Sequence, residues 1–260
     1  MLRALYSAAA GMESQQMNLD VISNNLANVN TTGYKESKLE FQDLLYQTTR
    51  AAGSEQGGGN QLPGSLQIGQ GAIPIATERV FTNGELSQTG GNLDVAIQGA
   101  GFFQVQMPDG TLAYTRDGGF KTDSEGRIVT SDGYPVQGGF QPVPSGTTNI
   151  TISASGSVTY TTSSGTTSSQ IQLANFNNPG GLNAVGHNLY KETTASGNAQ
   201  LGEPTQNGLG ELQQGYLELS NVSVVQEMVN LILAQRAYEV NSKAVQAADQ
   251  MMQDSNNLQR

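Results

Sequence analysis

The residues that could take part in catalysis or metal binding are few and scattered in this sequence. The one histidine, His187, has no cysteine to share a metal with, because the chain contains none, and no carboxylate cluster lies near it in the sequence. Asp123 and Glu125 could act as acid and base in sugar hydrolysis, but their surroundings are typical of a solvated turn. The motifs G-x-x-x-x-G-K-[ST], G-x-S-x-G and H-E-x-x-H are absent. We therefore expect no catalytic, cofactor-binding or metal-binding residues, and no enzyme.

Repeated Asp-Gly pairs are the remaining candidates for a metal site. Asp109-Gly110, Asp117-Gly118 and Asp132-Gly133 could suggest calcium, yet no D-x-[DN]-x-[DN]-G loop surrounds them. Asp-Gly is also a favoured pair in two-residue hairpin turns. The pairs therefore predict turns between short strands.

Composition excludes several other classes of protein. With 260 residues and a net charge of −10, the chain has no basic cluster for nucleic acid. No run of 18 apolar residues occurs, so we expect no membrane insertion. The start, MLRALYSAAAG, faintly resembles a signal peptide, but a helical pattern runs through it, and we expect no cleaved signal. The lack of cysteine suits a protein that passes unfolded between compartments of different redox poise.

A long helix is predicted near the C-terminus, over residues 221–252, which contain no Gly or Pro. Nine of the thirteen residues 222–234 are apolar and point all round the helix, so several neighbours must enclose it. A second row is mostly Ala and would let another backbone approach closely: Ala234, Ala237, Ala244, Ala248 and Met251. The apolar residues at coiled-coil spacing are Val224, Met228, Leu231, Tyr238, Val245 and Met252.

A second helix is predicted over residues 2–29, closed by Gly33 in a left-handed conformation. Its seam residues are Leu5, Met12, Leu19, Ile22, Leu26 and Val29, with Ala8 and Gln15 between them. Two seams at opposite ends of one chain predict that the terminal helices pair as a coiled coil. Either the pair caps one globular domain, or it packs against other copies.

Residues 66–218 are predicted to form short antiparallel strands, because turn signals recur every eight to twelve residues. The fold class is therefore α+β, with the terminal helices beside an all-β middle domain, a sandwich or open barrel. Residues 145–170 are rich in Ser and Thr and are interpreted as an exposed hairpin. The expected core residues are Phe102, Phe103, Val105, Tyr114, Phe120, Ile128 and Val136.

Residues 23–35, SNNLANVNTTGYK, resemble the N-terminal signature of the bacterial flagellar axial proteins, the rod, hook and hook-associated subunits. Residues 94–138 and 214–252 resemble the middle and C-terminal segments of that family. The resemblance implies a helical homo-oligomer whose terminal helices line a hollow tube, with no cofactor. The signature residues are Asn24, Asn25, Leu26, Ala27, Asn28, Gly33 and Tyr34.

Residues 46–63 are interpreted as an extended loop and look like an insertion found in the distal-rod members of this family. The resemblance then implies a rigid shaft in the basal body that spans the periplasm. Its partners would be proximal rod and hook subunits, the surrounding rings and the flagellar export apparatus. The alternatives are a proximal rod or hook subunit, a secreted β adhesin on a coiled coil, and a cell-wall hydrolase. The expected domains are 1–34, 35–70 with the insertion, 71–220 and 221–260.

Overall fold

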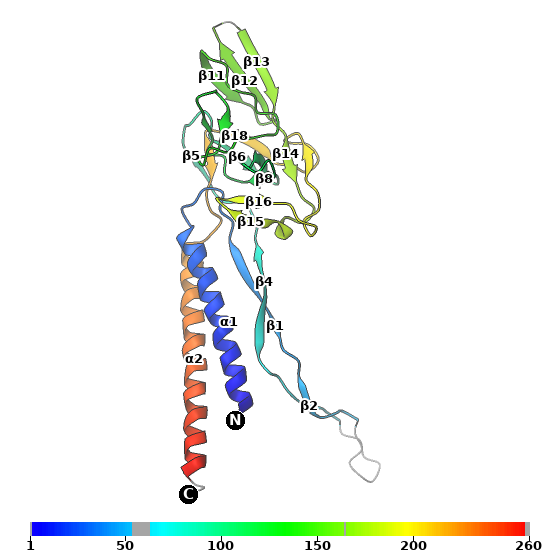
Figure 1. Cartoon of the computed structure of the whole chain (residues 1–260), viewed down its shortest axis with the longest axis vertical. Helices are drawn as coiled ribbons and strands as arrows, with labels where there is room; N and C mark the ends of the chain where they lie inside the picture. Colours follow the sequence, from blue (N-terminus) through cyan, green and yellow to red (C-terminus); the bar gives the residue numbers. More distant parts are fainter. Residues whose placement is uncertain (1, 54–62, 164, 258–260) are drawn as a thin grey trace. The chain divides into compact units, whose positions relative to one another are not determined.

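The structure is a computed structural model that describes residues 2–53, 63–163 and 165–257 (Figure 1). Its internal contacts divide the chain into two units. The helical unit comprises Met1–Leu26, Ser37–Glu78 and Val224–Arg260. The β unit comprises Ala27–Glu36 and Arg79–Ser223. Each unit therefore combines segments that are far apart in the sequence.

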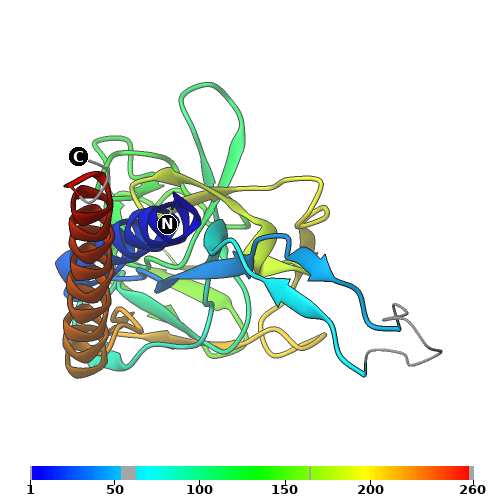
Figure 2. The same ribbon diagram turned by 90° about the horizontal axis from the view of Figure 1, so that it is seen from below.

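The helical unit contains two helices and a two-stranded ribbon. Helices α1 (Leu2–Ala27) and α2 (Val224–Asn257) run side by side and antiparallel (Figures 1 and 2). In the ribbon, β1 (Ser37–Asp43) pairs with β4 (Ala72–Arg79). Further along, β2 (Gln47–Arg50) pairs antiparallel with β3 (Leu66–Ile68).

The interpretation of residues 46–63 as a loop is wrong for Gln47–Arg50, which form β2. Two consecutive threonines, Thr48 and Thr49, favour an extended backbone there, and β3 supplies the partner strand. Residues 54–62 of the insertion lie outside the described part of the chain.

Helix α1 ends at Ala27, earlier than the predicted Val29. A turn follows at once, in which Thr31 donates from its backbone N–H to the Asn28 carbonyl (3.1 Å) and from its hydroxyl to Oδ1 of Asn28 (3.2 Å). Gly33 is left-handed (φ 68°), as predicted, but it does not close the helix. A Cβ at Gly33 would lie 2.6 Å from the backbone nitrogen of Asp117, so this position requires glycine for close packing.

The middle of the chain is built of short strands in several small sheets, with one 3-10 turn (Pro179–Gly181). The largest sheet has the order β15-β16-β8-β7, and a second has the order β11-β12-β13. The remaining pairs are β9 with β10, β14 with β17, β6 with β18 and β5 with β19. All these pairs are antiparallel, which confirms the α+β class. The strands are β5 (Leu86–Gln88), β6 (Val95–Gln98), β7 (Phe103–Gln106), β8 (Leu112–Thr115), β9 (Lys121–Thr122), β10 (Ile128–Val129), β11 (Thr147–Ile152), β12 (Ser157–Thr162), β13 (Gly165–Gln170), β14 (Leu173–Asn175), β15 (Asn183–Gly186), β16 (Leu189–Lys191), β17 (Gln200–Gly202), β18 (Glu211–Gln214) and β19 (Tyr216–Glu218).

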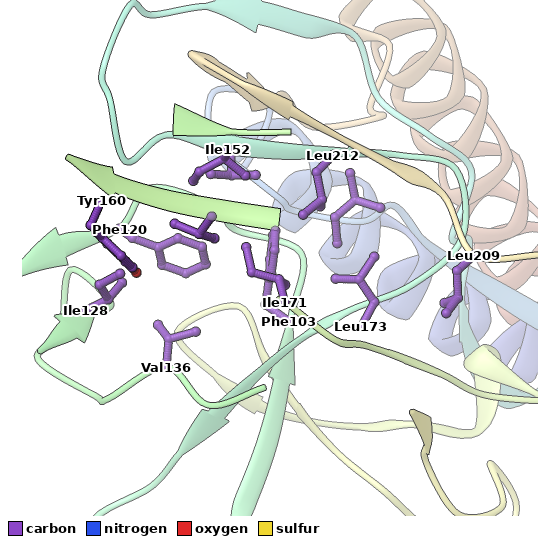
Figure 3. Close-up of a cluster of buried hydrophobic side chains, with 13 residues drawn as sticks. Phe103, Phe120, Ile128, Val136, Ile152, Tyr160, Ile171, Leu173, Leu209 and Leu212 are labelled. Atoms are coloured by element: carbon purple, nitrogen blue, oxygen red, sulfur yellow. The ribbon is translucent and has the colours of Figure 1, made fainter. Parts of the chain in front are cut away.

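The hydrophobic core of the β unit contains all seven predicted core residues, each buried. The main cluster gathers side chains from many strands around Phe103 and Phe120, whose rings meet edge to face at 5.0 Å (Figure 3). A second cluster is aromatic and centres on Phe102, Tyr114, Phe176 and Tyr190. A third, smaller cluster holds Val105, Ala113 and Leu189, so the β unit has an apolar interior of its own, divided into three clusters.

The interpretation of residues 145–170 as an exposed hairpin is wrong. They form the three strands β11, β12 and β13, and Ile152, Val158 and Tyr160 are buried in the main cluster. In β12 the buried residues alternate with threonines, so the high Ser/Thr content concealed a core-facing strand. Asp117-Gly118 is also not a hairpin turn. Gly118 packs against the backbone of Val95, and the Val95 N–H donates to the Gly118 carbonyl (3.1 Å).

Candidate assembly surface

The residues considered for catalysis occupy ordinary surface turns. The His187 side chain is 63% exposed, and its Nδ1 lies 3.3 Å from Asp132 Oδ2. Asp123 accepts hydrogen bonds from the backbone N–H groups of Glu125 (2.8 Å) and Arg127 (2.9 Å). Within residues 2–53, 63–163 and 165–257, no three His, Cys, Asp or Glu side chains are placed to hold a metal ion. Over the same ranges, no helix is long and apolar enough to cross a membrane.

Exposed apolar side chains are concentrated in the helical unit. Of the twenty-one large apolar residues that are exposed in the described chain, eighteen belong to this unit. The other three are Leu112, Val185 and Leu201. On α2 they are Val224, Val225, Met228, Val229, Ile232, Leu233, Tyr238, Val240 and Met251. On the ribbon and α1 they are Phe41, Leu45, Tyr46, Leu66, Ile68, Ile73, Ile75, Tyr6 and Met17.

The inside of the helical unit is formed by small and polar side chains. Its buried apolar residues are Ala8, Ile22, Ala234 and Ala248. Midway along the helices, a Cβ at Gly11 would lie 2.8 Å from Nδ2 of Asn241, so α1 and α2 approach closely there. Among the described residues, the buried positions of this unit are therefore small or polar except for Ile22, while many large apolar side chains are exposed, unlike those of a stable isolated hairpin.

Asn25 joins three elements at the C-terminal end of α1. Its Nδ2 donates to the Ser37 carbonyl (2.9 Å), and its Oδ1 accepts from the Ser37 N–H (3.0 Å). The same Nδ2 donates to Oε2 of Glu227 (3.4 Å), and Asn25 and Glu227 are both buried. This contact fixes α1, β1 and α2 in one register without burying large apolar area.

The predicted seam on α2 is rotated relative to the observed contact face. Leu231, Val245 and Met252 are half-buried, but Val224, Met228 and Tyr238 are exposed. The observed contact face includes a row at seven-residue steps, formed by Glu227, Ala234, Asn241 and Ala248. Each of these residues lies one position before a position of the predicted seam, the first of which is Met228. One position turns a helix by about 100°, which moves Met228 outward. The reason is that the small residues allow a closer approach than the apolar row would.

On α1, the predicted seam residues face inward to differing degrees. Ile22 is buried, while Leu5, Met12, Leu19 and Leu26 are half-buried. Val29 belongs to the β unit and is half-buried there. Among the signature residues, Asn25, Gly33 and Tyr34 are buried, Leu26 and Asn28 are half-buried, and Asn24 and Ala27 are exposed.

A buried cluster of charges in the β unit was not predicted from the sequence. Lys35 Nζ lies 2.6 Å from Glu218 Oε1, and both side chains are 0% exposed. Arg116 Nη1 lies 3.5 Å from the other Glu218 oxygen. Lys35 also donates to the Thr82 carbonyl (2.7 Å), and the Gly84 N–H donates to Glu218 (2.9 Å). Burial lowers the pKa of Lys35, although the Glu218 carboxylate acts in the opposite direction.

This charge cluster connects three distant parts of the sequence. Lys35 directly follows the signature, Arg116 follows β8, and Glu218 ends β19 shortly before α2. Arg116 also donates to the Gly99 carbonyl (2.7 Å). No spacing rule relates charges so far apart, so the sequence could not have revealed the cluster.

The fold and the surface together define a class of protein: a structural chain with one well-packed unit and one unit whose large apolar faces are uncovered in a single copy. Three family models match, described as flagella basal body rod protein (residues 5–35), flagellar hook protein FlgE/F/G D1 domain (96–160) and flagellar basal body rod FlgEFG protein C-terminal (213–258).

Several relatives match along nearly their whole length. Proteins called flagellar basal-body rod protein FlgG are 49% identical in Caulobacter vibrioides (99% of each chain) and 48% identical in Borreliella burgdorferi (100% of each chain). The one from Buchnera aphidicola is 47% identical over 99% of this chain and 100% of its own. The chain belongs to the flagellar basal-body rod protein family, which is structural and not enzymatic.

Proposed function

We propose that this chain is the structural subunit of the flagellar distal rod, where copies assemble helically into a hollow, rigid shaft that transmits torque from motor to hook. The observation that carries the proposal is the concentration of exposed apolar side chains in the helical unit. The names of the full-length relatives support it. The shaft lies in the basal body and spans the periplasm.

Magnitudes favour an assembly in which both α2 and the ribbon are covered. Fully burying one Val, Leu, Ile or Met side chain contributes roughly 1.5–3 kcal/mol. The part-exposed residues of α2 would then contribute on the order of 10 kcal/mol per copy. Association costs about 4–15 kcal/mol in lost freedom, so α2 alone is barely enough. Contacts that also cover the ribbon supply the remaining free energy of association.

The proposed neighbours are further copies of this chain, proximal rod and hook subunits, the surrounding rings and the export apparatus. Nothing in the comparisons supports the adhesin, whose name appears on no relative among them. The proximal rod and the hook remain as alternatives within the family. A Bacillus subtilis relative called flagellar hook-basal body complex protein FlhP is 32% identical, below the relatives called rod protein FlgG.

Electron microscopy of the purified chain after polymerisation tests the proposal. We expect hollow tubes with helical symmetry, because the uncovered faces belong to elongated helices and a ribbon. Trimers with one coiled-coil stalk would instead support the adhesin. A chain that stays monomeric at every concentration and temperature tested would contradict self-assembly.

The insertion provides a test of the distal position. Deleting residues 47–62 removes β2 and leaves the Leu66–Ile68 edge of β3 without its partner. We propose that this segment braces neighbouring copies, so the deletion variant should form curved or flexible polymers. Curvature is measured by electron microscopy.

The matched control for this deletion replaces the same residues with a Gly/Ser segment of equal length. It keeps the chain length but removes the side chains, and we expect it to form curved polymers as well. If the deletion variant forms straight, stiff tubes, the insertion does not provide the rigidity.

A further inference from the structure

The β unit holds a small cavity of about 180 Å³ at Arg79. Two signature residues, Asn28 and Tyr34, lie on one side of it. On the other side lies the turn between β15 and β16, where His187 and Asn188 both have a left-handed backbone (φ 54° and 57°). Two lining residues, Leu189 and Tyr190, also belong to the apolar clusters of the β unit, whereas Arg79 and the turn do not.

Arg79 is half-buried and lies close to two aromatic rings. Its guanidinium carbon lies 5.8 Å from the ring centre of Tyr34 and 5.5 Å from that of Tyr190. Cation–π contacts of this kind restrain the position of the guanidinium.

The guanidinium of Arg79 has more donors than its neighbours use. It has five N–H donors; Nη1 donates to the Lys35 carbonyl at the long distance of 3.5 Å, and the Tyr190 hydroxyl lies within hydrogen-bonding reach. No carboxylate of the described residues lies within ion-pair distance of it. His187, which lines the cavity, has its Nδ1 3.3 Å from Oδ2 of Asp132. A cation with donors to spare therefore lines a cavity whose lining residues include no carboxylate.

The volume of the cavity and the charge of Arg79 restrict which chemical groups the cavity could bind. Pockets for drug-sized ligands usually measure about 300–1,000 Å³, so a cavity of about 180 Å³ suits one side chain better than a nucleotide or a sugar chain. A planar carboxylate is the group that a guanidinium binds through two parallel hydrogen bonds. The chain itself is rich in carboxylates, with 22 Asp and Glu against 12 Lys and Arg.

We propose that the cavity at Arg79 binds an Asp or Glu side chain of a second copy of this chain. The proposal rests on the self-assembly proposed above and assigns to it a polar contact made by the β unit. Arg and Tyr are enriched among the residues that dominate binding at protein interfaces, and Arg79 with Tyr34 and Tyr190 forms such a group in advance of binding.

The test compares variants of the full chain by the lowest concentration at which each polymerises, measured by sedimentation. Arg79→Gln removes the cation. Ala184→Phe fills the cavity from its rim and leaves Arg79 in place, since Ala184 is an exposed lining residue. Its matched control is Val185→Phe, at the adjacent exposed residue of β15, which does not line the cavity. Because only this chain is present, any effect reports contacts between copies.

We expect Arg79→Gln and Ala184→Phe each to raise the critical concentration at least tenfold, and Val185→Phe to leave it near that of the unmodified chain. If Arg79→Gln lowers the melting temperature of the monomer, its effect on polymerisation cannot be separated from loss of folding. The result for Ala184→Phe then decides whether the cavity takes part in polymerisation. Normal polymerisation by Ala184→Phe would overturn the proposal, because the cavity would then be dispensable. If the unmodified chain forms no polymer at all, the proposed function fails first, and that result is distinct from failure at the cavity.

Discussion

Glu218→Gln is expected to destabilise the β unit more than any other single charge-removing change. The side chain is fully buried, and its loss of charge leaves Lys35 and Arg116 without a counter-charge in the interior. Breaking a buried ion pair from one side costs roughly 3–5 kcal/mol, against a total stability of about 5–15 kcal/mol for a typical domain. We expect the melting temperature, measured by circular dichroism, to fall by roughly 10 °C or more.

Two further variants separate the charge cluster from general effects of mutation. Glu211→Gln makes the same chemical change at an exposed position of β18 and should shift stability by less than about 0.5 kcal/mol. Replacing Lys35, Arg116 and Glu218 together by Met, Met and Leu removes every charge of the cluster and should recover much of the loss. Equal melting temperatures for Glu218→Gln and Glu211→Gln would show that the cluster does not stabilise the fold.

The position of the cluster also has a consequence for the order of folding. In the sequence, Glu218 comes shortly before the C-terminal helix, and Lys35 directly follows the signature. The β unit therefore completes its interior only when segments from both ends of the chain are present. A chain of which only one end has been delivered would lack one member of the cluster, which would suit the unfolded export that we expect from the sequence.

The parts of the fold that follow from local patterns were predicted from the sequence. The two helices and the antiparallel middle depend on residue spacing and turn chemistry, and all seven expected core residues are buried. Long-range pairings could not be predicted in this way. The partner strands β1 and β4, for example, are separated by the whole of the insertion.

The helix contact face shows why the candidate surface was only partly predictable. The rule that apolar residues face inward selects Met228, yet Glu227 and Asn241 lie on the contact face. The predicted Ala row did include Ala234 and Ala248, which are buried. The apolar rule assumes that a helix buries its largest apolar residues within its own chain. That the exposed apolar row of α2 contacts other copies stays a prediction.

Leu233→Asp is expected to abolish polymerisation without harming the folded chain. Leu233 is 62% exposed, so the change removes little buried area within one copy. In the assembly that we propose, the new carboxylate would be enclosed among apolar side chains, and an unpaired buried charge costs several kcal/mol. A loss of that size raises the critical concentration by more than a hundredfold, since each 1.4 kcal/mol is about tenfold. Sedimentation measures the critical concentration.

Gln235→Asp is the matched control, because it introduces the same charge two residues later at another exposed position of the same helix. Both changes place Asp in a helix interior and lose similar helix propensity, so a difference between them reports the apolar contact and not the stability of α2. We expect Gln235→Asp to raise the critical concentration far less than Leu233→Asp. Tubes from Leu233→Asp at the normal concentration would mean that this face of α2 stays exposed in the assembly. The free energy of polymerisation would then have to come from burying the exposed apolar residues of the ribbon and of α1.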